Sequence, residues 1–267
     1  MSPAELLAHL WSDYVSSTPQ ARRIQELLAA RQEHVRNDHV ALRSFGVGDL
    51  GIPALARPFE AAGWRPRESY RFGDKHLRAR YWQHPDPQLP KVFISELIVD
   101  ELSAAAQALI AGLVAQVPAG FSERPDLPYS GRPWRLAQAT YQELLAESEY
   151  AAWMAAFGFR VNHFTVDVGS LTTFPGLVEL NAFLQDAGFA LNASGGVIKG
   201  SAADHLEQSS TLADVIDVTF DDGVLRLPSC YYEFALRHRL ASGELFQGFV
   251  PASASKIFES TDVAQQR

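Results

Sequence analysis

An internal duplication constrains the fold of this chain more than any other feature of its sequence. Segments 37–64 and 161–189 share one pattern: an apolar stretch around a histidine, a glycine-containing turn, an apolar helical pattern and a closing Ala-Gly-aromatic sequence. The closing aromatic residue follows His39 by 25 residues and His163 by 26. Repeats of this kind form like modules that pack together, so the two imidazoles are expected to meet. Two imidazoles at one point most often bind a metal ion.

The order of predicted elements indicates an α+β fold in one domain spanning 1–267. Apolar periodicity and turn residues give each module the order β-α-β-β-β. Paired modules of this order curl into a cupped sheet whose concave face can hold a metal. The predicted segments are N-terminal helices (1–36), a first module (37–98), a helical insert (99–157), a second module (158–240) and a C-terminal tail (241–267).

The second module departs from the first in its predicted strands. After its helix, strands are expected at 189–194, 207–211, 215–220 and 229–237, with an additional short segment at 224–227. The tail is expected to be loose from Ser253 onward, over the site or in solvent.

Composition excludes several classes of function. The net charge of −8 and the pI near 5.5 argue against binding along a nucleic-acid backbone, which requires a basic face. The most apolar stretch, 102–117, is too short to span a bilayer. The single cysteine, Cys230, permits no intrachain disulfide. Because the N-terminus lacks a basic region typical of a signal peptide, we expect a cytoplasmic protein that is bound neither to membranes nor to nucleic acid.

Strand alternation predicts which side chains share the concave face. His39 lies on one face with Arg43, whereas Asp38 is expected on the opposite face. Glu96 and Glu233 both fall in the strands that close the modules, so each is a candidate metal ligand.

The number of carboxylates determines the chemistry that the site can support. Two histidines and one carboxylate leave three open positions on an octahedral metal, as suits ferrous iron with a bidentate substrate and dioxygen. A fourth ligand from Glu96 would instead suit Zn²⁺ or Ni²⁺ in an isomerase, lyase or hydrolase. A small-molecule binding module with the same cup is a third hypothesis.

Several segments carry a resemblance to a known family. They are NDHVALR at 37–43, NHFT at 162–165, GG at 195–196, QSST at 208–211 and YEF at 232–234. These segments resemble the 2-oxoadipate dioxygenase/decarboxylase (hydroxyglutarate synthase) family, which is similar to the vicinal-oxygen-chelate fold. The resemblance covers roughly residues 35–240.

The resemblance implies Fe(II) bound by His39, His163 and Glu233, with Arg43 as the catalytic residue that binds a substrate carboxylate. It implies an oxidoreductase of lysine catabolism that converts 2-oxoadipate and O₂ to 2-hydroxyglutarate and CO₂. The distal carboxylate of this substrate requires a cationic anchor, and the guanidinium of Arg43 matches it in a bidentate fork. The other candidate substrate-binding residues are Lys75, Lys199, Gln208, Ser209 and Arg237.

Overall fold

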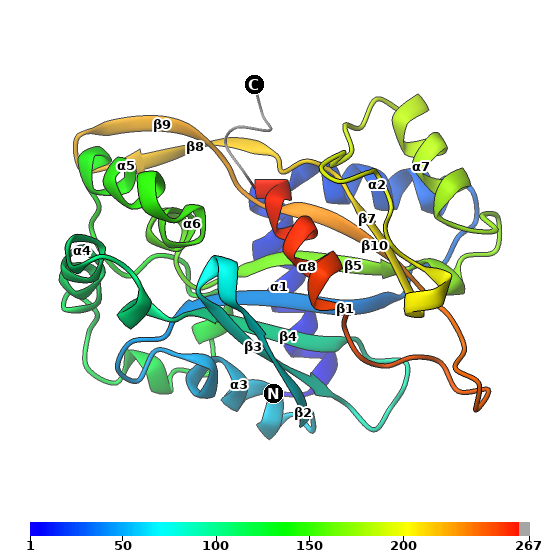
Figure 1. Ribbon diagram of the computed structural model, residues 1–267, viewed down its shortest axis with the longest axis horizontal. Helices are drawn as coiled ribbons and strands as arrows, with labels where there is room; N and C mark the ends of the chain where they lie inside the picture. Colours follow the sequence, from blue (N-terminus) through cyan, green and yellow to red (C-terminus); the bar gives the residue numbers. More distant parts are fainter. Residues whose placement is uncertain (262–267) are drawn as a thin grey trace.

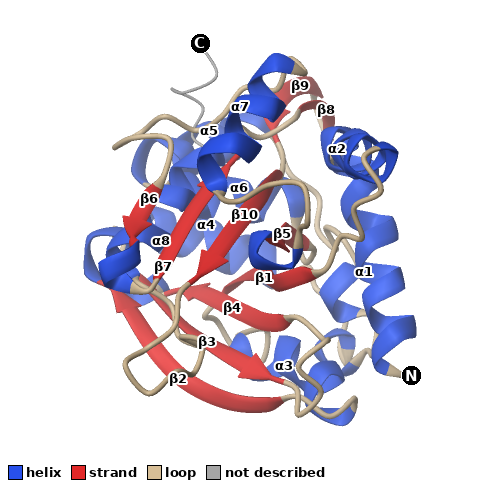
Figure 2. Cartoon of the chain, turned by 90° about the vertical axis from the view of Figure 1, so that its right-hand side faces the viewer, coloured by secondary structure: helices blue, strands red, loops and turns tan. Residues whose placement is uncertain are grey.

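An eight-stranded mixed sheet, curled into a half-barrel, forms the centre of the computed structural model, which describes residues 1–261 (Figures 1 and 2). Its strand order is β2-β3-β4-β1-β5-β10-β7-β6. The strands are β1 (Asn37–Phe45), β2 (Arg65–Phe72), β3 (Leu77–Gln83), β4 (Lys91–Leu97), β5 (Val161–Asp167), β6 (Lys199–Ser201), β7 (Leu206–Ser210) and β10 (Tyr231–Arg237).

The sequence repeat is visible in the pairing of the strands. β1 and β5, the first strands of the two modules, pair antiparallel at the centre of the sheet. β4 lies parallel beside β1, and β10 lies parallel beside β5. The two halves of the sheet therefore have equivalent orders outward from a common seam, and His39 and His163 lie on the two strands of that seam. The predicted α+β fold with a curled sheet is confirmed.

Several helices cover the outer face of the sheet. α1 begins at a capping box in which Ser2 and Glu5 bond each other's backbone and side-chain groups. On its buried side, the rings of Trp11 and Tyr14 pack on Phe164 and Tyr232, which point outward from β5 and β10. The helices are α1 (Pro3–Ser17), α2 (Pro19–Ala30), α3 (Ile52–Ala61), α4 (Ala104–Val114), α5 (Gln138–Glu147), α6 (Glu149–Phe157), α7 (Leu177–Asp186) and α8 (Pro251–Phe258). None of these helices has the length and apolarity needed to cross a bilayer.

The prediction of a strand at 189–194 was wrong. Apart from one isolated bridge at Leu191, this segment belongs to a loop, and the corresponding strand is the shorter β6. Gly195 and Gly196 have φ values of +68° and +104°, which end the extended conformation. The loop folds around the ammonium group of Lys199, which donates to three of its carbonyl groups.

The strand predicted at 215–220 exists but does not join the main sheet. It is β8 (Val215–Phe220), which pairs only with β9 (Gly223–Pro228) in a separate hairpin. The ring of Phe220 packs on Tyr141 of α5, and Arg132 donates to the carbonyl of Thr219. The hairpin is therefore held by the helical insert rather than by the sheet.

The C-terminal segment is also more ordered than predicted. Instead of a loose tail, α8 lies in the hollow of the sheet, followed by a 3-10 turn over 259–261 (Figures 1 and 2). It contacts β2 at one edge of the sheet and β6 and β7 at the other. Because α8 joins the two edges, it closes the half-barrel over the concave face. Residues 262–267 of the predicted tail lie outside the described residues.

Gly158, between α6 and β5, is expected to tolerate no side chain. Its φ is +68°, and a Cβ there would lie 2.3 Å from the carbonyl oxygen of Gly131. Gly158→Ala should lower the free energy of unfolding by about 2–3 kcal/mol, measured by urea denaturation. Gly112→Ala, at an open helical position in α4, should instead raise it by up to about 1 kcal/mol. Equal effects of the two substitutions would contradict this interpretation.

Candidate metal centre

Three buried side chains from three adjacent strands converge on the concave face: His39 of β1, His163 of β5 and Glu233 of β10. The Nε2 atom of His39 is 3.6 Å from Oε1 of Glu233, and Nε2 of His163 is 3.2 Å from Oε2. One ligand atom from each residue lies within 4.8 Å of the other two. Within residues 1–261 these are the only His, Cys, Asp or Glu side chains grouped closely enough to hold an ion.

The chemistry of the three residues fits a divalent cation. Oε2 of Glu233 is buried and accepts no hydrogen bond from any residue between 1 and 261. Burial raises the pKa of Glu233, although the neighbouring His39 acts in the opposite direction. Burial, followed by the nearby His39 and Arg43, holds the pKa of His163 well below its ordinary value. A neutral imidazole and a carboxylate with a free oxygen are the forms that bind a metal.

Two β-bulges orient the histidines. In the pairing of β1 with β5, Asp38 is an extra residue on β1 and Asn162 is an extra residue on β5. Oδ1 of Asp38 lies 2.7 Å from Nδ1 of His39, and Oδ1 of Asn162 lies 3.0 Å from Nδ1 of His163. Each bond directs Nε2 toward the site. The expectation that Asp38 faces away from His39 was therefore wrong, because the bulge interrupts strand alternation.

Arg237 binds Asp38, the residue whose carboxylate contacts His39. Its guanidinium donates hydrogen bonds to both carboxylate oxygens of Asp38, with Nε 2.5 Å from Oδ2. It also donates to the carbonyl groups of Phe246 and Gly248. Burial opposes ionisation of Asp38, but Arg237, Lys91 and the bond to His39 together hold its pKa well below the ordinary value. A substrate-binding role for Arg237 is not supported, since its guanidinium already binds the carboxylate of Asp38 and two backbone carbonyl groups.

Asp38→Asn is expected to lower the metal affinity by about 10–100-fold, the usual effect of removing a group that orients a metal ligand. The affinity is measured by titrating the metal-free protein with Fe(II) under anaerobic conditions. Asp167→Asn is the matched control, since Asp167 pairs with the half-exposed Arg36 on the same sheet and does not touch a histidine. Equal metal affinities for wild type and Asp38→Asn would contradict the orienting role.

Glu96 is not a fourth ligand. Its carboxylate accepts from the backbone N–H of Ile52, at the start of α3, and pairs with Arg78. The sheet register decides this question, which the sequence left open: Ala41 lies opposite Phe93, whereas the equivalent residue Thr165 lies opposite Glu233. Phe93 is therefore the counterpart of Glu233, and Glu96 points to the other face. The hypothesis of a Zn²⁺ or Ni²⁺ enzyme rested on Glu96 as a second carboxylate ligand, and the structure does not support that ligand.

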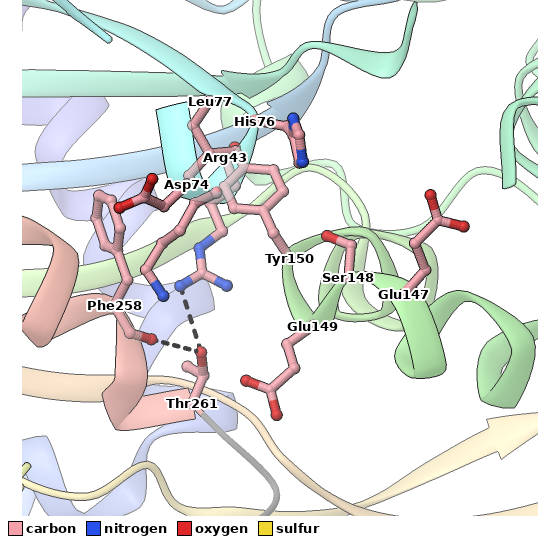
Figure 3. Close-up of a pocket in the computed structure, with 11 residues that line it drawn as sticks. Arg43, Asp74, His76, Leu77, Glu147, Ser148, Glu149, Tyr150, Phe258 and Thr261 are labelled. Carbon is pink, nitrogen blue, oxygen red and sulfur yellow. Dashed lines mark hydrogen bonds between the residues drawn. The ribbon is translucent and has the colours of Figure 1, made fainter. Parts of the chain in front are cut away.

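Arg43 follows His39 by four residues on β1 and so lies on the same face of the strand. It lies at the edge of a cavity of about 240 Å³ (Figure 3). The residue is 3% exposed, and its guanidinium carbon lies 5.0 Å and 4.9 Å from the ring centres of Tyr150 and Trp153. Within the described part of the chain, its side chain donates one hydrogen bond, to Oγ1 of Thr261 at 3.3 Å. No carboxylate within residues 1–261 pairs with Arg43, so a buried positive charge faces this cavity.

The other predicted substrate-binding residues have different surroundings. Lys75 lines the cavity beside Arg43. Gln208 reaches the metal centre, where its Nε2 donates to Oε1 of Glu233 at 2.6 Å. Ser209 points to the outer face, where its hydroxyl donates to Asn181 of α7, and this position speaks against substrate binding. Lys199 is bound by the carbonyl groups of its own loop, which also removes it from the candidates.

Phe258 of α8 separates the metal centre from the Arg43 cavity, because its side chain lines both. On the metal side it leaves a space of only about 10 Å³ between the three ligands and α8. Phe249 also covers the centre, with its ring 4.9 Å from that of His39. Sequence reasoning missed these residues because no motif marks them; the apolar periodicity of 254–258 was the available signal.

Comparison with known proteins identifies the family. The model of the 2-oxoadipate dioxygenase/decarboxylase family matches residues 5–124 and 132–244. The chain belongs to this family. A relative from Oryza sativa subsp. japonica, named 2-oxoadipate dioxygenase/decarboxylase, is 36% identical over 282 residues, which cover 96% of this chain and 78% of the relative. The family and the enzyme class predicted from the sequence are thus confirmed.

Solved structures agree with this membership of the 2-oxoadipate dioxygenase/decarboxylase family. The hydroxyglutarate synthase from Oryza sativa, in complex with 2-oxoadipate, is 35% identical with a TM-score of 0.93, covering 98% of this chain and 92% of that one. A protein from Shewanella frigidimarina NCIMB 400, provisionally named a hydrolase, is 47% identical with a TM-score of 0.90, covering 94% and 98%. A protein from Ralstonia eutropha JMP134, named for the glyoxalase superfamily, shares only the fold, at 21% identity and a TM-score of 0.77 over 91% and 84%.

Proposed function

We propose that this chain converts 2-oxoadipate and O₂ to 2-hydroxyglutarate and CO₂, with Fe(II) bound by His39, His163 and Glu233. Both atoms of one dioxygen enter the 2-hydroxyglutarate, one in the carboxylate formed from the keto carbon and one in the new hydroxyl group, while the carboxylate next to the keto group leaves as CO₂. Ferrous iron in a site of two histidines and one carboxylate offers open positions for a chelating 2-oxo acid and dioxygen. The Oryza sativa structure named for its complex with 2-oxoadipate supports this choice of substrate.

The guanidinium of Arg43, which no carboxylate of residues 1–261 pairs with, is the observation that carries the proposal. A buried charge without a counter-ion is unfavourable by several kcal/mol, and a substrate carboxylate would supply that counter-ion. Arg43 follows His39 by four residues on the same strand face, about 13 Å along the strand. The two side chains thus flank a span suited to an extended dicarboxylic acid with its 2-oxo end at the metal and its distal carboxylate at Arg43. Lys75 adds positive charge to the distal end, and Gln208 offers its amide at the metal end.

Substrate binding requires displacement of Phe258. The space of about 10 Å³ beside the ligands holds no more than a water molecule, whereas the substrate must run from the metal to Arg43. We therefore assign to α8 the role of a cover that shifts when the 2-oxo acid enters and then excludes bulk water.

The fold type and the cellular location complete the proposal. The curled sheet is of the vicinal-oxygen-chelate type, which the glyoxalase-superfamily neighbour supports at the level of fold. The cytoplasmic location predicted from the sequence remains a prediction, since the two plant relatives are named as plastid proteins.

Oxygen uptake tests the proposed function. Protein loaded anaerobically with Fe(II) is mixed with 2-oxoadipate in an oxygen electrode, and the products are identified by mass spectrometry. We expect one O₂ consumed and one CO₂ released for each 2-hydroxyglutarate formed. Absence of uptake with every 2-oxo dicarboxylic acid tested, in protein that retains iron, would overturn the proposal.

A further inference from the structure

Tyr231 carries a buried hydroxyl group without a partner. The residue is fully buried, and its Oη makes no hydrogen bond to any described residue. Leaving a buried hydroxyl unpaired is unfavourable by about 1–3 kcal/mol, so such a group in a folded protein requires an explanation. Its neighbour Tyr232 is equally buried, but its hydroxyl accepts from Nε2 of Gln25 at 3.0 Å on the outer face.

The strand register places Tyr231 between the metal centre and Arg43. Glu233 lies opposite Thr165, which lies opposite His39, so these residues form one row across the sheet. Tyr231 belongs to the next row, opposite His163. Arg43 lies beyond that row, because β1 runs antiparallel to β5.

The side chain of Tyr231 extends on the concave face beside the ligands. Its ring stacks on that of His163, with centroids 4.6 Å apart and planes 25° from parallel. It packs against Ile257 of α8, which itself borders the space at the metal. The hydroxyl thus lies in the part of the cup that a molecule bound between the metal and Arg43 would cross.

We propose that the Tyr231 hydroxyl is a substrate-binding group, which donates a hydrogen bond to an oxygen atom at the 2-oxo end of the bound acid. The inference rests on the proposed function and adds a residue to it. Stacking on His163 fixes the ring, so the hydroxyl is aimed before the substrate arrives. A carboxylate or keto oxygen then satisfies the donor that the free protein leaves unpaired.

Tyr231→Phe and Tyr232→Phe form a matched pair that tests the proposal. Each removes one oxygen from a fully buried tyrosine, and the two positions are adjacent on opposite faces of β10. Metal affinity, thermal stability of the metal-free protein and 2-oxoadipate affinity of the anaerobic Fe(II) protein are measured for each variant.

For Tyr231→Phe we expect unchanged metal affinity, a melting temperature equal to or above that of wild type, and 2-oxoadipate binding weakened by about tenfold to a hundredfold. For Tyr232→Phe we expect a lower melting temperature and unchanged substrate binding. Wild-type substrate affinity in Tyr231→Phe would overturn the inference and leave the proposed function intact. Failure of the wild-type protein to bind 2-oxoadipate would overturn the proposed function itself, and the role of Tyr231 with it.

Discussion

Glu233→Gln is expected to reduce the affinity for Fe(II) by more than about 100-fold, beyond the effect of losing a residue that only orients a ligand, and to abolish oxygen uptake. The metal-free variant should nevertheless be at least as stable as the wild type. Burial raises the pKa of Glu233, which means that the folded protein disfavours its ionised form, and a glutamine of nearly the same shape carries no charge. Anaerobic metal titration and thermal unfolding of the metal-free protein measure the two effects.

Glu96→Gln is the control for this substitution. Glu96 is as buried as Glu233 and lies on the strand equivalent to β10, but its carboxylate binds the start of α3 and Arg78. Its replacement should lower stability and leave the metal content unchanged. Loss of metal from Glu96→Gln, or retention of metal by Glu233→Gln, would contradict the assignment of ligands.

Arg43→Met should remove the preference for a distal carboxylate. Breaking a buried charge pair between protein and ligand typically weakens binding by about 2–5 kcal/mol, roughly 30-fold to several thousand-fold. We expect this loss in kcat/KM for 2-oxoadipate, and a far smaller loss for 2-oxohexanoate, which has the same chain length without the second carboxylate. Steady-state oxygen uptake with the two substrates measures the difference.

Two further variants sharpen this prediction. Arg43→Lys keeps the positive charge but loses the paired N–H donors of the guanidinium. Its preference for 2-oxoadipate over 2-oxohexanoate should therefore lie between those of the wild type and Arg43→Met. Lys75→Met, in the same cavity but partly exposed, should reduce the preference by less than about tenfold, since water screens its charge. An Arg43→Met enzyme that still prefers 2-oxoadipate over 2-oxohexanoate by the wild-type factor would show that the distal carboxylate binds elsewhere.

The sequence repeat predicted the central part of the site because it is encoded by strand pairing. The two histidines open equivalent strands, and an antiparallel seam between those strands brings them together. Alternation along β10 correctly placed Glu233 on the same face as Tyr231. The role of Glu96 stayed open at the level of the sequence, because the position in register, rather than the distance along the chain, decides which residue faces the metal.

The remaining parts of the fold and of the site depend on features that no local sequence pattern encodes. The bulges turn Asp38, which was expected on the opposite face, and Asn162 toward the histidines, and a bulge is set by how two distant strands pair. The position of α8 depends on contacts with both edges of a sheet whose strands are far apart in sequence. The hairpin β8–β9 has ordinary strand residues, and only the helical insert decides where it packs.

An anomalous-scattering map of crystals soaked anaerobically with Fe(II) tests most directly the claim that one ion joins the two modules. The account predicts a single strong peak at coordination distance from Nε2 of His39, Nε2 of His163 and the carboxylate of Glu233, and the loss of that peak in Glu233→Gln crystals. A map without a peak among these three side chains, or with the ion bound at other residues, would contradict it.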